Sequence, residues 1–304
     1  MTTVTINGPL PGIYRSLPAA DYHRLDCPGR SMLHKLAQGW TPAHVRYAMC
    51  RPGLDTDALA LGSALHVALL EPSRYQDVVH LGPVNPKTGR TYGRDTKAWT
   101  EAEDAVGAIL LTTDQAAQVA PMIAALQSHP LIVATTSLVT EREVTCIATL
   151  DLRQIAQEQH LAWKAEWGED DRLVVKTRLD MVGGGIIADL KTMTTSRRPG
   201  LRGIEWYAVE YGLMHQAALY PRVARACGIE VEHFAVLAIE KEEPYLPFYL
   251  RVSQWGADTA MRELLPAMVT AARCYRTDEW PGYPQDVVDL DPPEAWVKQV
   301  EAIR

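Results

Sequence analysis

The sequence has no apolar stretch long enough to span a membrane and no leader-like start. A membrane helix needs roughly 18 or more consecutive apolar residues, and no segment of the 304 residues approaches that length. The opening MTTVTINGPLPGIY also lacks the basic and apolar regions of a secretory signal peptide. We therefore expect a soluble protein of the cytoplasm.

The five cysteines include no C-x-x-C pair, so their spacing indicates neither a zinc ribbon nor a disulfide framework. Free cysteines are often buried. We expect core thiols at Cys27, Cys50, Cys146, Cys227 and Cys274.

The chain also lacks a positive net charge, since its formal charge is −7. Neutralisation of phosphates by Lys and Arg supplies most non-specific affinity for nucleic acid, so a protein that simply coats DNA is not expected. A local basic groove remains compatible with this charge. Arg197, Arg198 and Arg202 form one basic cluster, which is either part of such a groove or a solvated loop.

The composition is that of a globular protein with a full core. Hydrophobic residues make up 47% of the sequence, and there is no low-complexity tract. We predict a single domain over residues 1–304. Within it we expect an N-terminal loop and helix (1–55), a core (56–280) and a C-terminal tail (281–304).

Apolar periodicity, capping residues and prolines predict the helices. We expect them near residues 31–39, 56–70, 100–127, 204–227 and 254–276. A polar, glycine-containing loop at 85–99 leads into the third helix. Residues 152–171 show no clear period, and we expect them to form an exposed excursion.

Alternating and β-branched segments predict the strands. One or two are expected within 131–150, and two more within 233–252 around a turn at Pro244. Another pair flanks Gly183–Gly185, which predicts a hairpin because glycine tolerates the positive φ of a tight turn. The order of elements indicates an α/β fold with a central mixed sheet flanked by helices.

The segment IIADLKT carries the strongest chemical signal. Residues two apart on a strand share a face, so Asp189 and Lys191 project together. The glycine turn would bring Asp180 beside Asp189, although the register is not fixed by the sequence. Two such carboxylates repel each other unless a cation lies between them. Oxygen ligands suit Mg²⁺ or Mn²⁺, which would neutralise a phosphate and lower the pKa of a bound water.

Lys191 would then orient or deprotonate that water, or stabilise the transition state. The alternative is structural. An isolated D-x₈-D-x-K pattern also describes an aspartate that caps a hairpin and an exposed Asp–Lys pair.

Other polar residues add to this pattern. His66, in the apolar segment LGSALHVALLEP, is either a hydrogen-bonded core residue or an additional metal ligand. Gln216 and Tyr220 are four residues apart and share one helix face, which either is half-buried or contacts DNA or Lys191. Glu141 or Glu143 could support the metal site, and the clean alternation of EVTCI favours Glu143.

Seven segments in order make the sequence resemble the RecE (exonuclease VIII) family of the PD-(D/E)XK nuclease superfamily. They are GIYRSLPAADYH, SMLHKL, LGSALHVALLEP, TRLDMV, ADLKT, YGLMHQAALY and TDEWP, and they span residues 12–281. The resemblance implies a restriction-endonuclease-like core. Leu179 stands where many relatives have Pro, and Pro221 is expected to kink or end the helix directly after Tyr220.

The resemblance also implies roles for individual residues. The implied metal ligands are His66, Asp180, Asp189 and the backbone carbonyl of Leu190. The implied catalytic residues are Lys191, Asp189, Asp180, Gln216 and Tyr220, to which the alternation of EVTCI, and not the resemblance, adds Glu143. Candidate contacts to DNA are Arg178, Arg197, Arg198 and Arg202. The implied cofactor is Mg²⁺ or Mn²⁺.

The implied activity is 5′ to 3′ exonuclease digestion of one strand of linear double-stranded DNA, which leaves a 3′ overhang for recombination. Relatives form rings of three or four subunits, so a homo-oligomer is expected. A single-strand annealing protein of the RecT type is the expected partner, in a phage or prophage setting. The alternatives are a RecB-type nuclease acting on single strands and a DNA-binding recombination accessory that does not cleave.

Overall fold

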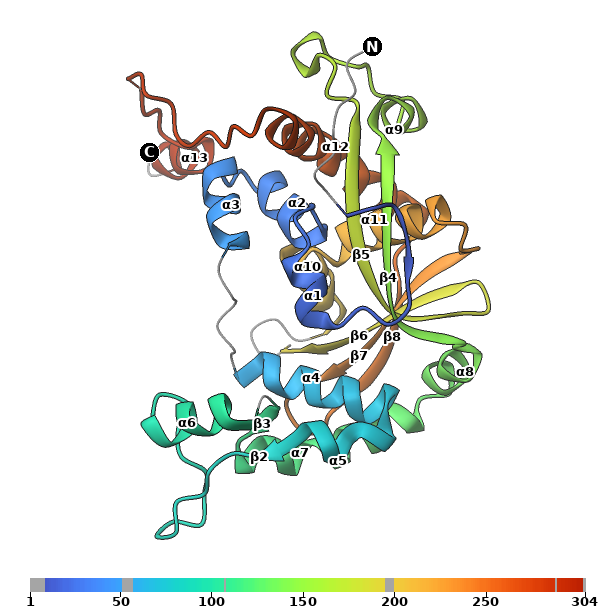
Figure 1. Cartoon of the computed structure of the whole chain (residues 1–304). Helices are drawn as coiled ribbons and strands as arrows, with labels where there is room; N and C mark the ends of the chain where they lie inside the picture. The colour runs from blue at the N-terminus through green and yellow to red at the C-terminus, as the bar shows by residue number, and fades with distance from the viewer. Residues whose placement is uncertain (1–8, 51–56, 107, 195–199, 288, 303–304) are drawn as a thin grey trace.

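A strongly twisted six-stranded mixed sheet lies at the centre of the molecule (Figure 1). The computed structural model describes residues 9–50, 57–106, 108–194, 200–287 and 289–302. In spatial order the strands are β1 (Gly12–Tyr14), β4 (Glu141–Asp151), β5 (Arg172–Gly183), β6 (Ile186–Met193), β7 (His233–Glu240) and β8 (Pro247–Arg251). All neighbours are antiparallel except β6 and β7. The predicted α/β fold with a central mixed sheet is confirmed.

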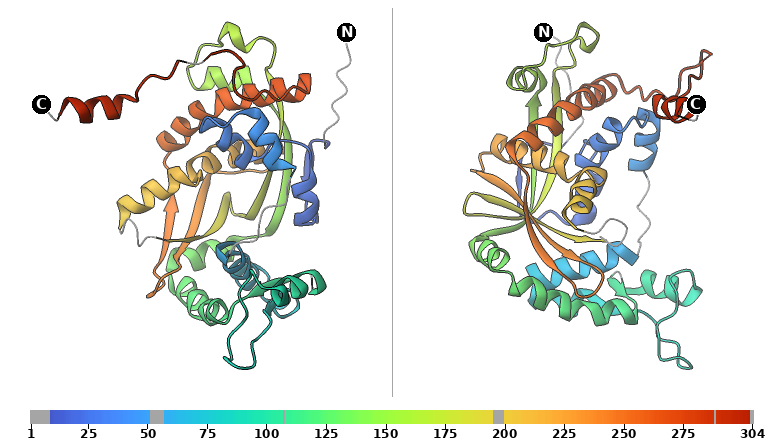
Figure 2. Two further views of the ribbon diagram at one scale, coloured as in Figure 1. Left: turned by 90° about the vertical axis from the view of Figure 1, so that its left-hand side faces the viewer. Right: turned by 180° about the vertical axis from the view of Figure 1, so that it is seen from behind.

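One layer of helices packs on each face of the sheet (Figure 2). The first layer contains α2 (Arg30–Ala37), α3 (Pro42–Met49), α10 (Leu201–Glu210), α11 (Leu213–Ala226) and α12 (Gln254–Thr277). The short α1 (Ala19–Arg24) has no buried residue and contacts β5 through Tyr22 and Lys176. The second contains α4 (Asp57–Leu70), α5 (Tyr75–Val78), α6 (Lys97–Val106), α7 (Thr113–Ser128) and α8 (Pro130–Leu138), with the small parallel pair β2 (Val79–Leu81) and β3 (Ile109–Leu111). Each layer encloses its own cluster of buried apolar side chains.

Among the described residues, no single helix is long and apolar enough to cross a membrane; α7 and α8, bent by 88°, pass that test together on length and composition only. The last helix, α13 (Glu294–Glu301), has no buried residue and stands away from the body (Figure 2, left). Of the cysteines, Cys50 is exposed, which corrects the prediction that all five are core thiols.

The glycine hairpin is confirmed. Gly184 and Gly185 have φ values of +55° and +76°, which glycine adopts without steric cost. A Cβ at Gly183 would lie 2.1 Å from the carbonyl oxygen of Leu138. The turn therefore requires glycine both for its backbone conformation and for the close approach of the chain that precedes β4.

The prediction of strand for residues 131–138 is wrong, because these residues form α8. Pro130 occupies the first turn, where its missing N–H costs nothing. Ile132 and Thr135, three residues apart, are buried on one side of this helix. The Thr136 hydroxyl donates to the Ile132 carbonyl at 3.0 Å. Tertiary packing thus overrides the β propensity of the branched residues.

Two predicted long helices are each divided. The segment 204–227 forms α10 and α11, which are separated at Gly212, whose φ is +68°. A Cβ at Gly212 would lie 3.0 Å from the His34 ring, so contact with α2 requires the break. Pro221 does not end α11, which continues to Ala226. The segment 100–127 contains the end of α6, all of β3 and most of α7.

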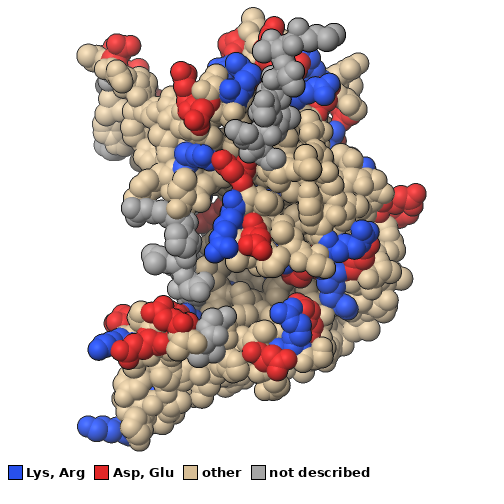
Figure 3. Space-filling model, viewed as in Figure 1, with Lys and Arg blue, Asp and Glu red and all other residues tan. Residues whose placement is uncertain are grey.

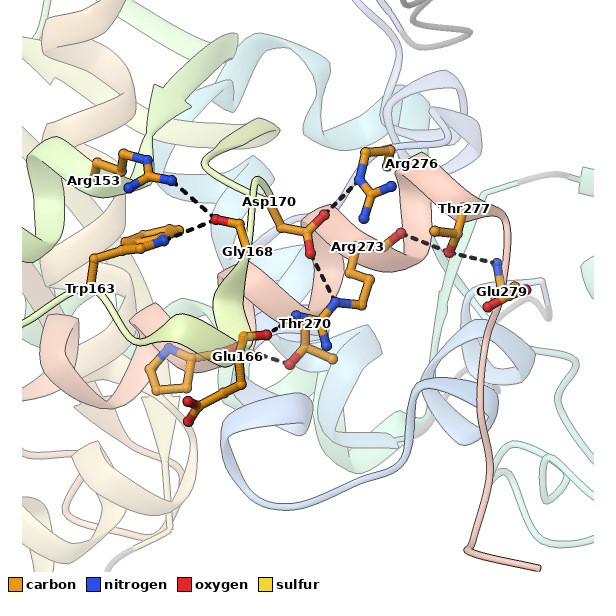
Figure 4. A network of polar contacts seen from close by, with 11 residues as sticks. Arg153, Trp163, Glu166, Gly168, Asp170, Thr270, Arg273, Arg276, Thr277 and Glu279 are labelled. Carbon is orange, nitrogen blue, oxygen red and sulfur yellow. Dashed lines mark hydrogen bonds and ion pairs between the residues drawn. The ribbon is translucent and has the colours of Figure 1, made fainter.

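The segment 152–171 is not an exposed excursion, because it folds as α9 (Leu152–Glu158) and a short 3-10 turn (Ala165–Trp167) against α12. Figure 4 shows the polar anchor. The Asp170 side chain is 2% exposed and accepts from Arg273 Nε at 2.8 Å and Arg276 Nε at 2.7 Å. The buried residues of α9, Leu152, Ile155 and Ala156, do have helical spacing, but this stripe covers only one helix of seven residues.

Candidate active site

His66 reaches the sheet from α4. Leu61 and Leu65 of α4 are buried in the second core cluster. His66 is the next residue in the helix and lies at the edge of this packing. Its Nε2 lies 3.0 Å from the Leu190 carbonyl oxygen and 3.5 Å from Asp180 Oδ2. An Nε2–H therefore donates to the Leu190 carbonyl oxygen, and Nε2 must be unprotonated to become a metal ligand.

Glu143 faces Asp180 across the β4–β5 pair. The register pairs Arg142 with Met181 and Val144 with Leu179, which sets Glu143 opposite Asp180. Glu143 has a φ of +53°, a conformation that is costly for a residue with a side chain and is concentrated at functional sites.

One ligand atom each from His66, Glu143 and Asp180 lies within 4.8 Å of the other two. One imidazole nitrogen and two carboxylate oxygens are a donor set that suits Mn²⁺ or Mg²⁺. Two carboxylates placed opposite each other repel, and a cation between them would remove that repulsion. These residues therefore fit a divalent metal ion.

Arg178 holds Glu143 in place. Its Nε donates to Glu143 Oε2 at 2.5 Å, and its Nη1 donates to the Leu17 carbonyl at 2.8 Å. The Arg178 side chain is only 16% exposed. The Arg178 guanidinium is held by protein acceptors on two segments, and the DNA contact that we expected for this residue stays a prediction.

The Asp180 carboxyl lies in an environment that disfavours its charge. Burial and, next, the neighbouring Asp189 raise its pKa to about 7, while His66 and Lys191 act in the opposite direction. Asp180 Oδ2 also accepts the backbone N–H of Leu190 at 3.1 Å. A bound cation would stabilise the ionised form of this carboxyl.

Asp189 and Lys191 share a face of β6, as the alternation predicts. The Asp189 carboxylate is buried; Gln216 donates to its Oδ1, and the Lys191 ammonium pairs with its Oδ2. We expected Asp189 to share one ion with His66 and Asp180, but the cluster that the structure assembles contains Glu143 in its place. Ligation by Asp189 stays a prediction.

The remaining predicted residues lie in different places. Tyr220 is buried in the first core cluster, with its ring edge-on to Phe234 at 6.1 Å, so this position gives no support to a catalytic role. Arg202 is exposed in the first turn of α10. Arg197 and Arg198 lie outside the described residues.

A histidine pair that the sequence did not single out supports the helix carrying Gln216. His34 on α2 and His215 on α11 bring their Nδ1 atoms to 2.8 Å, and His215 Nε2 lies 3.0 Å from Glu263 Oε2 on α12. Burial is the largest cause that lowers the pKa of both histidines. The motifs SMLHKL and MHQ contain these residues, but only the packing of α2 on α11 shows that they meet.

The face of the molecule drawn in Figure 3 is hollowed between the N-terminal helices and α4. Acidic and basic side chains lie side by side around this hollow rather than in a continuous basic strip. The arrangement is consistent with a site at which a cation, more than a row of arginines, would offset the charge of a phosphate.

The fold and the sequence each match a known group. A crystal structure of a candidate exonuclease from Eubacterium rectale superposes with a TM-score of 0.58 and 13% sequence identity, over 93% of this chain and 98% of that one. No curated protein matches the sequence. A model of the PDDEXK-like domain of unknown function (DUF3799) matches residues 25–288, which confirms the predicted PD-(D/E)XK-type fold, and the chain belongs to this family.

Proposed function

We propose that this protein is a metal-dependent nuclease that hydrolyses phosphodiester bonds of DNA. One observation carries the proposal: ligand atoms of His66, Glu143 and Asp180 converge within 4.8 Å beside the Asp–Lys pair of β6. A bound Mg²⁺ or Mn²⁺ would supply charge neutralisation at the phosphate and a water of lowered pKa.

The chain's own residues supply positioning and a positive charge. The Lys191 side chain is 25% exposed, so a phosphate can approach it from solvent. Asp189 holds that ammonium, and Gln216 fixes the other oxygen of Asp189. Lys191 can therefore stabilise negative charge that develops on the phosphate, or hold the attacking water by a hydrogen bond.

The finer activity that we propose is exonuclease digestion of one strand of linear double-stranded DNA in the 5′ to 3′ direction. The motif order shared with the RecE family supports it, as does the likeness in fold to the E. rectale protein. A homo-oligomeric ring, a RecT-type annealing partner, and a cytoplasmic, phage or prophage setting belong to the same proposal.

The test uses linear duplex DNA labelled at the 5′ or the 3′ end and covalently closed circles, each with Mg²⁺ or EDTA. Loss of the linear substrate alone, only with metal and with early release of the 5′ label, supports the proposal. Lys191→Ala should abolish digestion, whereas Lys298→Ala, an exposed lysine of α13, should not. Binding without digestion would indicate the accessory protein, and digestion of single strands alone would indicate a RecB-type nuclease.

A further inference from the structure

We propose that Tyr207 and Tyr211 of α10 form a platform on which an unpaired base of the nucleic acid strand stacks beside the metal site. The inference rests on the proposed nuclease function, because that function identifies the ligand as nucleic acid. It adds a binding element made of aromatic rings instead of charges.

The two rings already form a stack. Tyr207 and Tyr211 are four residues apart, at the end of α10 and just beyond it, with ring centroids 4.2 Å apart and an interplanar angle of 24°. The Tyr207 hydroxyl donates to the Thr192 carbonyl at 3.2 Å. Thr192 directly follows Lys191, so the stack is attached to β6 within one residue of the proposed catalytic lysine.

The far end of the stack is open. Tyr211 is 53% exposed, and Trp206 on the same helix is 59% exposed. Keeping the Tyr211 ring in water forgoes the free energy of burying it, which a stacked ligand would recover. A flat ligand placed on Tyr211 would extend the stack by one ring.

The surrounding charges favour a base over a phosphate as the stacked group. Arg30 Nη1 donates to the Tyr211 carbonyl at 3.0 Å and places one positive charge at the platform. Glu205 and Glu210 on the same helix oppose a purely ionic contact with the backbone. Every base has a π face, so stacking tolerates any sequence, as digestion of a strand requires. Bases within a duplex already stack on one another, which is why the platform suits an unpaired one.

The test measures binding in EDTA, so that it does not depend on cleavage. Fluorescence anisotropy compares a labelled oligothymidylate with an abasic oligonucleotide that has the same number of phosphates. Wild-type protein should bind the abasic strand more weakly. Tyr211→Leu should weaken oligothymidylate binding about 5- to 150-fold, because stacking on one aromatic contributes about 1–3 kcal/mol. Tyr211→Phe should stay within about 2-fold, since stacking requires only the ring.

Three further measurements separate stacking from other causes. Tyr211→Leu should leave abasic binding unchanged, and its effect on oligothymidylate should persist as salt is raised, because phosphate contacts carry the salt dependence. Tyr283→Leu in the exposed C-terminal segment is the matched control. The platform is overturned if the wild-type protein binds the oligothymidylate and the abasic strand with equal affinity. It is also overturned if Tyr211→Leu loses the same affinity for both strands. Absence of DNA cleavage would overturn the proposed nuclease function. The binding measurements would still test the platform, because they are made in EDTA.

Discussion

Glu143 lies opposite Asp180 on neighbouring strands, and ligand atoms of the two carboxylates and His66 lie within 4.8 Å of one another. In a fold without a cation this pair is held together against its own repulsion. Arg178 offsets part of the charge from one side, through Glu143. The same two carboxylates that would bind a metal ion therefore destabilise the metal-free protein.

Asp180→Asn should make the metal-free protein more stable. The amide oxygen can still accept the Leu190 N–H, while the charge that faces Glu143 and Asp189 is removed. In EDTA we expect the midpoint of thermal unfolding to rise by about 1.5–2 °C for each kcal/mol of relieved repulsion. On addition of Mn²⁺ the wild-type midpoint should rise and that of the variant should not. If Mn²⁺ raised the unfolding midpoint of the variant as much as that of the wild type, Asp180 would not be a metal ligand.

Arg178→Ala should weaken metal binding by roughly 10-fold, the effect typical of losing a residue that orients a ligand. The reason is that Glu143 loses the guanidinium that fixes its carboxylate. Calorimetric titration with Mn²⁺ measures the change. Arg15→Ala is the matched control, because Arg15 pairs with Glu141 on the same strand at 2.6 Å but is exposed. If Arg178→Ala kept its Mn²⁺ affinity and lost only DNA binding, Arg178 would be a DNA contact and not a residue that positions Glu143.

The sequence was sufficient where the chemistry is local. The spacing of Asp189 and Lys191 follows from strand alternation, and the glycine turn joins their strand to the one that carries Asp180. The sequence was insufficient where the pairing of two distant segments sets the strand register. That Glu143 faces Asp180 depends on how β4 pairs with β5, and a shift by one residue would have turned Glu143 to the other face.

The errors in secondary structure have the same origin. The break before α11 arises because Gly212 meets His34, which is far away in the sequence. Residues 131–138 have strand propensity, yet Pro130 and the burial of Ile132 make them a helix. In each case a contact made only in the folded chain outweighs a preference of the local segment.

Asp170→Asn should destabilise the fold and leave the active site intact. The buried carboxylate accepts charge-assisted hydrogen bonds from Arg273 and Arg276, and both arginine side chains are about half exposed. Because solvent screens these partners, we expect a loss of about 1–3 kcal/mol in the free energy of unfolding. Urea unfolding measures it.

The control for this variant is Asp171→Asn, whose carboxylate pairs with Arg153 and is 35% exposed. This change should cost less, on the order of 0.5 kcal/mol. Equal losses in the two variants would show that Asp170 does not anchor the segment to α12.

Acidification should destabilise the protein through His34 and His215. Burial is the largest cause that lowers both folded-state pKa values below 6.5. Below that pH the unfolded chain therefore binds more protons than the folded protein, and stability falls as the pH decreases. Above it, both states are neutral at these positions and the contribution is flat. The raised pKa of Asp180 contributes in the opposite direction over the same range, so the histidine effect is measured as a difference. Between pH 7 and pH 5 the free energy of unfolding of His34→Gln should shift in favour of the variant relative to that of the wild type. An exposed-site control, His44→Gln, should keep the wild-type slope. If His34→Gln also kept that slope, the pair would not be the source of the pH dependence.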